Sequence, residues 1–281
     1  MELNDGIHLR SIEVRPWPEP LDGTFPFSVP TLRSMGRLEF NAPVTFLVGE
    51  NGSGKSSLLE ALACAVGSVT VGAESVLHDP SLAALRKFAQ YLRLVWKKRT
   101  HKGFFLRAED FFGYARRMEK IKSDLRQDLA DVEADTRERS KMAYNLSRMP
   151  YQRELSAIEQ RYGPGLDCRS LGESFLVLFQ ERFVPGGLYL LDEPEVPLSP
   201  LRQLSFLALL KRMVGEQAQF LIATHSPILM AFPGAEILEF DSGSIRPAKY
   251  EDLEHVCLTR DFLNNPSAFL RHLGEEKNDE N

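Results

Sequence analysis

The chain has 281 residues, of which 43% are hydrophobic and 26% are charged, and its formal net charge is -5. These values are typical of a globular protein with a substantial core, and they exclude an intrinsically disordered chain. The negative charge gives no overall electrostatic reason to bind nucleic acid or an anionic membrane.

The cysteines and the apolar runs indicate the compartment. Cys64, Cys168 and Cys257 lack the paired spacing of a metal site, and three cysteines cannot form a closed set of disulfides. This usage is typical of a reducing environment. The first residues show neither the basic nor the apolar region of a signal peptide, and no run approaches 18 apolar residues. We therefore expect a cytoplasmic protein without a membrane partner.

The first part of the chain combines strand patterns with a long helical region. Residues 7–48 predict β structure, because "IHLRSIEVR" alternates in polarity and "PVTFLV" is a continuous apolar run. Residues 55–66 predict a helix that ends before Gly67. Residues 79–162 are mostly helical in pattern, with breaks expected at "MPYQ" and "YGPG". One apolar stripe in this region comprises Met118, Ile121, Leu125, Leu129 and Val132.

Strand and helix patterns alternate in the rest of the chain. "GGLYLLD" and "AQFLIA" are patterns of buried strands, and a helix from Pro200 to Gly215 is predicted between them. "AEILEFDSGSIRPA" predicts a hairpin turned at residues 241–244, and the polar residues 274–281 are expected to be disordered. This order predicts an α/β fold around a mixed, largely parallel sheet, with an N-terminal antiparallel β element. We expect one domain, residues 1–281, with a helical insertion at residues 80–165.

The stretch "GENGSGKSS" is the strongest signal in the sequence. It matches G-x-x-x-x-G-K-[ST], with an apolar strand pattern before it and a helix pattern after it, as a phosphate-binding loop requires. Glycines allow backbone N–H groups to turn toward a phosphate, and the helix N-terminus adds its positive end. We expect the lysine to reach the β- and γ-phosphates and the following serine to bind Mg²⁺. The predicted nucleotide-binding residues are Gly49, Glu50, Asn51, Gly52, Ser53, Gly54, Lys55, Ser56 and Ser57.

Two later motifs supply acidic and basic groups at strand ends. In "LYLLDEP", Asp192 ends an apolar run where it could hold Mg²⁺, and Glu193 could act as general base toward an attacking water. Without the phosphate loop, the same residues would indicate only a buried strand before an acidic turn. In "FLIATHSP", His225 follows a third apolar strand, at the edge where α/β sheets bind ligands. We expect His225 to sense the γ-phosphate, although a lone histidine is more often structural.

Together these motifs resemble those of the ABC-type ATPase superfamily. "GENGSGKSS", "LYLLDEP" and "ATHSP" resemble its Walker A, Walker B and switch-histidine motifs. The chain is most similar to small standalone AAA/ABC-type ATPases, which are related to the heads of chromosome-maintenance and recombination-repair ATPases. The resemblance implies a P-loop NTPase that takes ATP and Mg²⁺ and forms a head-to-tail homodimer around two nucleotides. It assigns catalytic roles to Lys55, Glu193 and His225.

The resemblance also implies a signature loop that a second copy of the chain donates. In "RSLGE", Ser170 and Gly172 match signature residues that contact nucleotide in trans, and Leu171 replaces the first glycine of the family pattern. Alternatively, Ser170 caps a helix, with Glu173 as its capping-box partner. Three weaker matches are Leu198 and Ser199 in the position of the D-loop and Glu109 in that of the Q-loop glutamine.

Residues 80–108 contain no acidic residue. They contain eight Lys and Arg residues, Arg86, Lys87, Arg93, Lys97, Lys98, Arg99, Lys102 and Arg107, and among them lie aromatic residues that include Tyr91, Trp96, Phe104 and Phe105. Such a lobe could neutralise phosphates and stack on bases, which makes DNA a candidate partner. The alternative is a solvated helix face whose aromatic side chains lie in the core.

The sequence therefore favours an ATP-hydrolysing switch that dimerises with ATP. The resemblance suggests work in DNA repair, chromosome maintenance or phage defence. Two alternatives stay open: the nucleotide-binding subunit of a transporter, and a non-hydrolysing, ATP-gated module that binds an unidentified protein partner.

Overall fold

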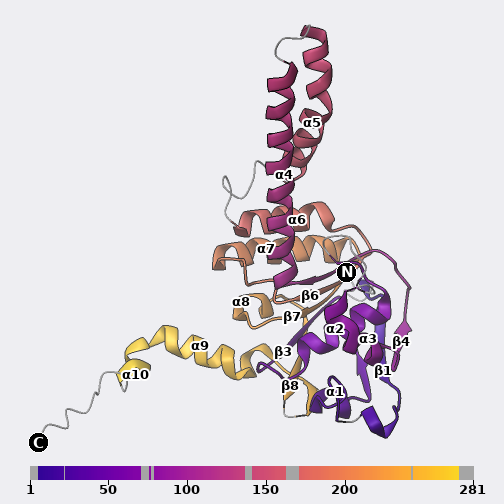
Figure 1. Ribbon diagram of the computed structural model, residues 1–281. Helices are drawn as coiled ribbons and strands as arrows, with labels where there is room; N and C mark the ends of the chain where they lie inside the picture. Colours follow the sequence, from indigo (N-terminus) through magenta and orange to yellow (C-terminus); the bar gives the residue numbers. More distant parts are fainter. Residues whose placement is uncertain are drawn as a thin grey trace, which may run out of the picture.

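The computed structural model describes residues 6–21, 23–70, 76, 79–136, 141–162, 171–241 and 243–271. These residues form a body of two sheets and their covering helices, from which a long helical hairpin projects (Figure 1). The terminal helices α9 (Glu254–Asn264) and α10 (Pro266–Leu270) extend away from the body in another direction (Figure 1). The expected disorder of residues 274–281 concerns a segment outside the described residues.

The larger sheet has six strands in the order β5-β6-β7-β3-β8-β9. All neighbouring pairs are parallel except β8–β9, which is the hairpin predicted at its turn. This confirms the predicted α/β fold with a mixed, largely parallel sheet. The strands are β3 (Val44–Gly49), β5 (Phe105–Arg107), β6 (Leu188–Asp192), β7 (Gln219–Ala223), β8 (Glu236–Asp241) and β9 (Ser244–Pro247).

The smaller sheet is antiparallel, in the order β2-β1-β4. Its strands are β1 (Leu9–Val14), β2 (Arg37–Glu39) and β4 (Leu92–Trp96). The predicted N-terminal antiparallel element is thus confirmed, but the mostly helical prediction for residues 79–162 is wrong at β4 and β5. These short segments become strands because β1 and β6, which are distant in the sequence, offer them an edge to pair with.

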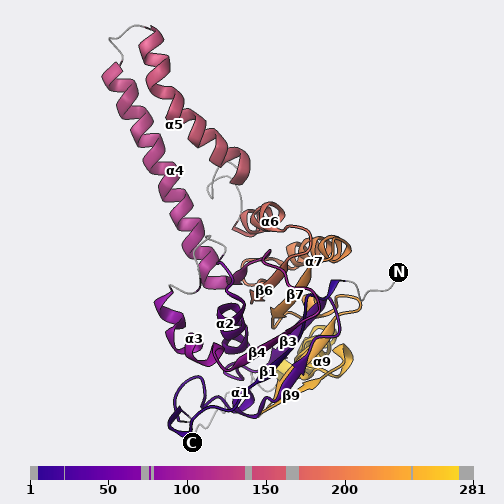
Figure 2. The same ribbon diagram turned by 90° about the vertical axis from the view of Figure 1, so that its right-hand side faces the viewer.

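Helices cover both faces of the larger sheet, because successive strand side chains point to opposite faces. Tyr189 and Leu191 pack with α6 (Leu171–Arg182) and α7 (Pro200–Gly215) in one core. Leu188 and Leu190 pack with α2 (Lys55–Val66) and α3 (Ala83–Ala89) in the other. Figure 2 shows these two helical layers from the side. The remaining short helices are α1 (Pro30–Ser34), α8 (Pro227–Met230), η2 (Glu19–Leu21), η3 (Pro80–Leu82) and η4 (Tyr250–Asp252).

The projecting hairpin consists of α4 (Ala108–Thr136) and α5 (Lys141–Tyr162), which pack against each other. The break expected at "MPYQ" is wrong, because α5 continues through Pro150. A proline inside a helix forgoes one backbone hydrogen bond and does not always end the helix. The break expected at "YGPG" coincides with the end of α5, beyond which the chain is not described until α6. None of the described helices has both the length and the apolar character of a membrane span.

Candidate functional site

The loop between β3 and α2 has a backbone that only glycine can form at two positions. Gly49 has φ +139°, and a Cβ there would lie 2.3 Å from the carbonyl oxygen of Phe240 on β8. Gly54 has φ +102°, and a Cβ there would lie 2.7 Å from the Thr31 hydroxyl. That hydroxyl donates a hydrogen bond to the carbonyl of Ser53, so α1 supports the loop from outside. The loop is therefore built as the motif predicts.

Lys55 lies buried in this loop, at 5% exposure. Its Nζ donates to the carbonyl oxygens of Gly49 at 2.8 Å and Glu50 at 2.7 Å, across the opening of the loop. Burial lowers the pKa of Lys55, while the carboxylates of Asp192 and Glu193 act in the opposite direction. The N-cap residue of α2 is Gly54, which makes no side-chain hydrogen bond to the first turn of the helix. A lysine beside a helix N-terminus, whose N–H groups point toward the loop, is suited to bind an anion.

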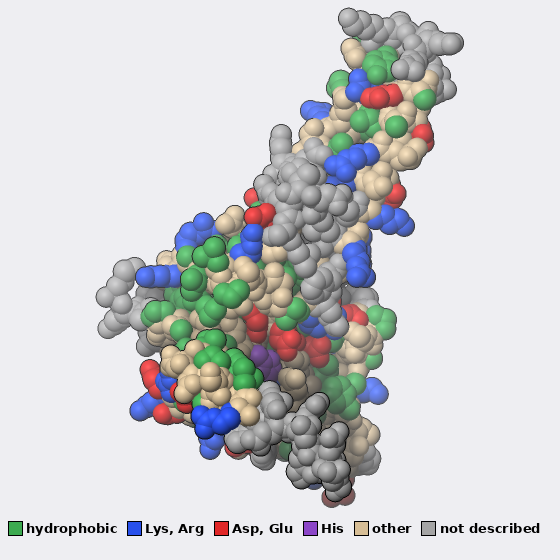
Figure 3. All heavy atoms as spheres, turned by 90° about the vertical axis from the view of Figure 1, so that its left-hand side faces the viewer, with side chains coloured by type: hydrophobic (Ala, Val, Ile, Leu, Met, Phe, Trp, Pro, Cys, Tyr) green, Lys and Arg blue, Asp and Glu red, His purple; other side chains and the backbone are tan. Residues whose placement is uncertain are grey.

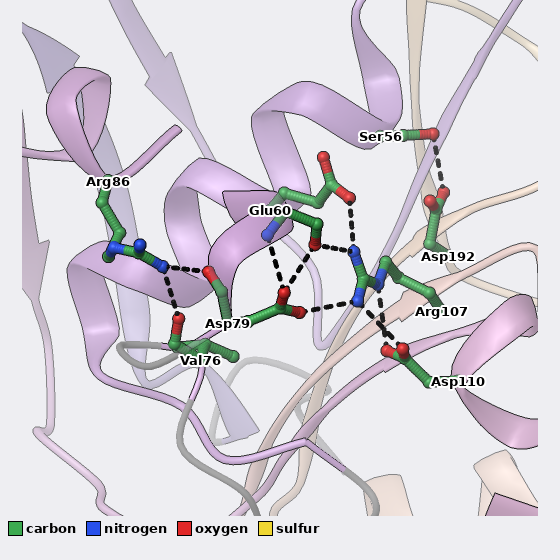
Figure 4. Close-up of polar contacts among 9 residues, drawn as sticks. Ser56, Glu60, Val76, Asp79, Arg86, Arg107, Asp110 and Asp192 are labelled. Carbon is green, nitrogen blue, oxygen red and sulfur yellow. Dashed lines mark hydrogen bonds and ion pairs between the residues drawn. The ribbon is translucent and has the colours of Figure 1, made fainter. Parts of the chain in front are cut away.

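The Ser56 hydroxyl donates a hydrogen bond of 3.1 Å to Oδ1 of Asp192 at the end of β6 (Figure 4). Burial, together with the neighbouring carboxylates Glu193 and Glu60, raises the pKa of Asp192 to about 7, against the hydrogen bond from Ser56 and the charge of Lys55. A buried carboxylate with too few positive neighbours favours a bound cation. Two cis ligands of an octahedral Mg²⁺ lie about 2.9 Å apart, since its bonds to oxygen measure about 2.0–2.1 Å. The Ser56–Asp192 pair therefore fits the ion.

This pair would supply two protein ligands to the ion. Among the described residues, no group of three or more His, Cys, Asp or Glu side chains is arranged to hold a metal ion. Phosphate oxygens and waters would have to complete the coordination, which is usual for Mg²⁺ at nucleotide sites.

Glu193 follows Asp192 with a positive φ of 50°, which is uncommon for a residue with a side chain. Its N–H donates to the carbonyl of Ala223 at 2.9 Å, which extends the pairing of β6 with β7 by one residue. Its carboxylate is 40% exposed and lies 3.9 Å from Nε2 of His225, whose side chain is equally exposed. Backbone strain of this kind is typical of functional sites. The structure thus brings together the two residues that the sequence predicted separately.

His225 and the neighbouring Ser226 are each hydrogen-bonded to a residue that the sequence analysis did not identify. The backbone N–H of His225 donates to Glu195 Oε1 at 2.7 Å, and the hydroxyl of Ser226 donates to Gln203 Oε1 at 2.5 Å. Burial lowers the pKa of His225, and the charge of Lys55 lowers it further, while the carboxylate of Glu193 acts in the opposite direction. The only sequence signal for Glu195 is a second acid two residues after Glu193; Gln203 has no signal.

The three residues of the weaker family matches follow strands β5 and β6 in the sequence. Glu109 lies in the first turn of α4, just after β5, but its side chain is outside the described part of the structure. Leu198 is buried, and Ser199 is the residue before α7 without a side-chain hydrogen bond to the helix. The roles of all three as D-loop and Q-loop residues stay predictions, as do contacts of the exposed loop residues Asn51 and Gly52 with nucleotide.

The signature match lies at the start of α6. Ser170 is outside the described residues, so neither its cap nor its trans contact can be placed. Gly172 is buried, and a Cβ there would lie 2.7 Å from the carbonyl oxygen of Pro197 and 2.8 Å from Cδ of Arg202. Glu173 pairs with Arg202 at 2.6 Å. Gly172 is thus required for packing within its own chain, whatever it contacts in trans.

The acid-free stretch divides into two parts with different environments. Phe104 and Phe105 are buried in the core, so the interpretation that they stack on bases is wrong. Arg107 is buried among carboxylates, and Arg86 donates to the carbonyl oxygens of Val76 and Asp79, so neither presents its charge as an open phosphate contact (Figure 4). The exposed basic residues of the stretch are Lys87, Arg93, Lys97, Lys98, Arg99 and Lys102. By contrast with this basic stretch, acidic side chains lie next to histidine on the face that Figure 3 shows, which is the left-hand side of Figure 1.

Among the solved structures that match the chain are three with TM-scores below 0.5. CbiO1 from Clostridium perfringens, part of the ABC transporter complex cbiONQ, has a TM-score of 0.47 at 16% identity, covering 95% of this chain and 98% of that chain. A nucleotide-free ATP-binding cassette from an ABC transporter has a TM-score of 0.46 at 16% identity, covering 96% and 100%. The Smc head domain from Pyrococcus furiosus, with an extended coiled coil and bound to the C-terminal domain of ScpA, has a TM-score of 0.42 at 10% identity, covering 91% and 99%.

Two family models match the sequence. A model described as an AAA domain matches residues 32–161, and one described as "AAA domain, putative AbiEii toxin, Type IV TA system" matches residues 174–231. The first segment contains the phosphate loop, and the second contains the acidic pair and His225. A search of curated proteins found no match. The two family matches, together with the P-loop geometry, confirm the resemblance of the chain to P-loop ATPases of the AAA type.

Proposed function

We propose that the protein binds ATP with Mg²⁺ at the carboxyl edge of the larger sheet and hydrolyses it to ADP and phosphate. One observation carries the proposal: the phosphate loop, the Ser56–Asp192 pair and the Glu193–His225 pair meet at that edge. The parts needed for phosphoryl transfer to water are thus close together, although they come from three separate segments.

Each residue has a distinct task in this reaction. Lys55 exchanges its contacts with the loop carbonyls for the β- and γ-phosphates, while the N–H groups of α2 bind the β-phosphate. Ser56 and Asp192 would hold Mg²⁺, which neutralises phosphate charge when bound. Glu193 takes a proton from a water whose oxygen attacks the γ-phosphorus, and the bond to the leaving ADP oxygen breaks. The imidazole of His225 hydrogen-bonds the γ-phosphate.

We further propose that two copies close on two nucleotides. Glu193 and His225 are each 40% exposed, so the site is open on one side. Three apolar side chains that follow Glu193 within eleven residues are also exposed, at Val196 (52%), Leu201 (74%) and Leu204 (54%). Exposed apolar side chains in the segment after the acidic pair support an interface there. A second copy would supply Ser170 and the N-terminus of α6 to this opening.

The substitution Glu193→Gln tests both statements. Loss of the general base should lower the hydrolysis rate about 10²- to 10⁴-fold. Because ATP then stays bound, the dimer should accumulate. Hydrolysis and light scattering at saturating ATP and Mg²⁺ measure the two effects. Glu154→Gln, an exposed carboxylate of α5, is the matched control and should behave as wild type. Wild-type hydrolysis by the Glu193 variant would refute the base, and a persistent monomer would refute the dimer.

The second family match also suggests a biological process for the protein. The description of the second family model names a putative AbiEii toxin, which supports phage defence over DNA repair or chromosome maintenance. The exposed Lys97, Lys98, Arg99 and Lys102 support a nucleic-acid contact. ATP hydrolysis measured with single- and double-stranded DNA at two salt concentrations tests it, because phosphate contacts weaken with salt. No stimulation by either nucleic acid would favour a protein partner.

A further inference from the structure

Arg107, at the carboxyl end of β5, contacts groups from three other elements (Figure 4). Its Nε and Nη2 donate to the two carboxylate oxygens of Asp110 at 3.0 and 2.9 Å. Nη2 also lies 2.9 Å from Oδ2 of Asp79, and Nη1 lies 3.4 Å from Oε1 of Glu60 and 3.2 Å from the Ser81 hydroxyl. The side chain of Arg107 is only 11% exposed, so these groups take the place of water around its charge.

Arg107 itself and one of its partners, Glu60, lie beside the nucleotide site. Glu60 follows Ser56 by one helical turn on α2, so the two side chains lie on the same face of the helix. Arg107 is the register partner of Asp192 in the parallel pair β5–β6. The helix α2 therefore meets these two strands at two neighbouring points, through Ser56 and Asp192 and through Glu60 and Arg107.

The contact with Asp110 lies at the base of the hairpin, whereas Asp79 and Ser81 lie at the start of η3. Asp110 and Phe111 are consecutive residues in the first turn of α4. Asp110 binds Arg107, while the buried ring of Phe111 packs edge-on against Phe175 of α6, with ring centroids 4.5 Å apart. The base of α4 is thus attached to α2 through Arg107 on one side and to α6 through an aromatic pair on the other.

We propose that the base of α4 mechanically links the P-loop helix α2 to helix α6, and that Arg107 is the positioning residue of this link. The inference rests on the proposed function, because it concerns the response to bound ATP. A shift of α2 moves Glu60, the guanidinium transmits the shift to Asp110, and α4 carries it to Phe175. Arginine suits this role because its planar fork holds several carboxylates in fixed directions, which a lysine cannot do.

Asp110→Asn tests the link by weakening its α4 side only, since Arg107 stays paired with Glu60 and Asp79. The matched control is Glu133→Gln, which breaks another carboxylate–arginine pair of α4, with Arg148 at 2.6 Å, away from the base. ATP affinity, turnover and hydrogen exchange of residues 108–115 are measured with and without ATP and Mg²⁺. We expect wild type and the control to gain protection at residues 108–115 when ATP binds. The Asp110 variant should bind ATP within about 2-fold of wild type, lose this gain, and turn over roughly 3- to 30-fold more slowly.

Arg107→Lys keeps the charge without the fork and should reproduce the Asp110→Asn result, which guards against a single variant that fails to fold. Wild-type turnover together with wild-type protection in both variants would overturn the link. So would a wild-type chain that binds ATP without any change in exchange at residues 108–115. If the wild-type chain binds no ATP, the proposed function itself fails, and that outcome is distinct from failure of the link alone.

Discussion

At the carboxyl edge of the larger sheet, side chains of the candidate site are held by partners from other elements, whereas the α4–α5 hairpin is held mainly by its own two helices. Lys55 binds two loop carbonyls, and the backbone of His225 is fixed by Glu195. On the hairpin, Met142 and Leu146 are 78% and 65% exposed. The edge is therefore pre-organised for chemistry, and the hairpin beyond its base is a surface on which substitutions should have small local effects.

The largest expected difference concerns nucleotide binding. Lys55→Ala removes a buried cation from the phosphate loop and should weaken ATP binding about 10²- to 10⁴-fold, because charge-assisted contacts to two phosphates are lost. Leu146→Glu on the hairpin should leave the affinity within about 2-fold. Calorimetric titration with ATP and Mg²⁺ measures both. Equal losses in the two variants would show that the hairpin and the edge are not separate in function.

A smaller effect concerns Asp192 and pH. The pKa of this carboxyl is about 7 in the folded protein and 3.8 as an ordinary value, so the folded state binds more protons between these pH values. Stability in the absence of Mg²⁺ should therefore fall as pH rises from about 4 to 7. Asp192→Asn removes the contribution of this carboxyl to the pH dependence of stability. The free energy of unfolding of the variant, relative to that of the wild type, should therefore rise by about 2–4 kcal/mol over that range. Denaturant unfolding at pH 4.5 and 8 in a chelator measures it, and a constant difference would contradict the buried carboxylate.

The smallest effect compares two helical glycines. Gly172→Ala places a Cβ against the carbonyl of Pro197, a backbone atom that cannot easily move, and should cost about 1–3 kcal/mol of stability. Gly113→Ala on α4 meets nothing within 4 Å and should be neutral or stabilise by up to about 1 kcal/mol, because alanine favours helix. Thermal unfolding measures both. A neutral Gly172 variant would show that α6 can move away from the loop at Pro197, which would weaken the contrast between edge and hairpin.

The sequence predicted elements whose signals lie in consecutive residues better than elements that form by contact with distant parts of the chain. The helix Lys55–Val66 and the strand ending at Asp192 were predicted correctly, because their signals lie in consecutive residues. The strands β4 and β5 were missed, because three to five residues become a strand only when a distant edge accepts them. The helix through Pro150 was also missed, since packing against α4 can outweigh the lost hydrogen bond.

Arg107 shows the same limit for a single side chain. In the sequence it is the last of a row of basic residues, which suggested a contact with nucleic acid. In the structure it is enclosed by Glu60, Asp79 and Asp110, two of which come from segments 47 and 28 residues away. The row of basic residues in the sequence therefore suggested an open phosphate contact for Arg107, whereas its guanidinium is buried among carboxylates.

The sequence by itself determined the chemistry that this protein can offer: a phosphate loop with Lys55 and Ser56, an acidic pair at Asp192 and Glu193, and a histidine at a strand end. These are properties of short segments, because each motif carries its own strand, turn and helix signals. Only the tertiary structure decided which groups meet. It placed Glu193 3.9 Å from His225 and Arg107 between the P-loop helix and the base of the hairpin, because parallel strands bring the ends of distant segments to one edge.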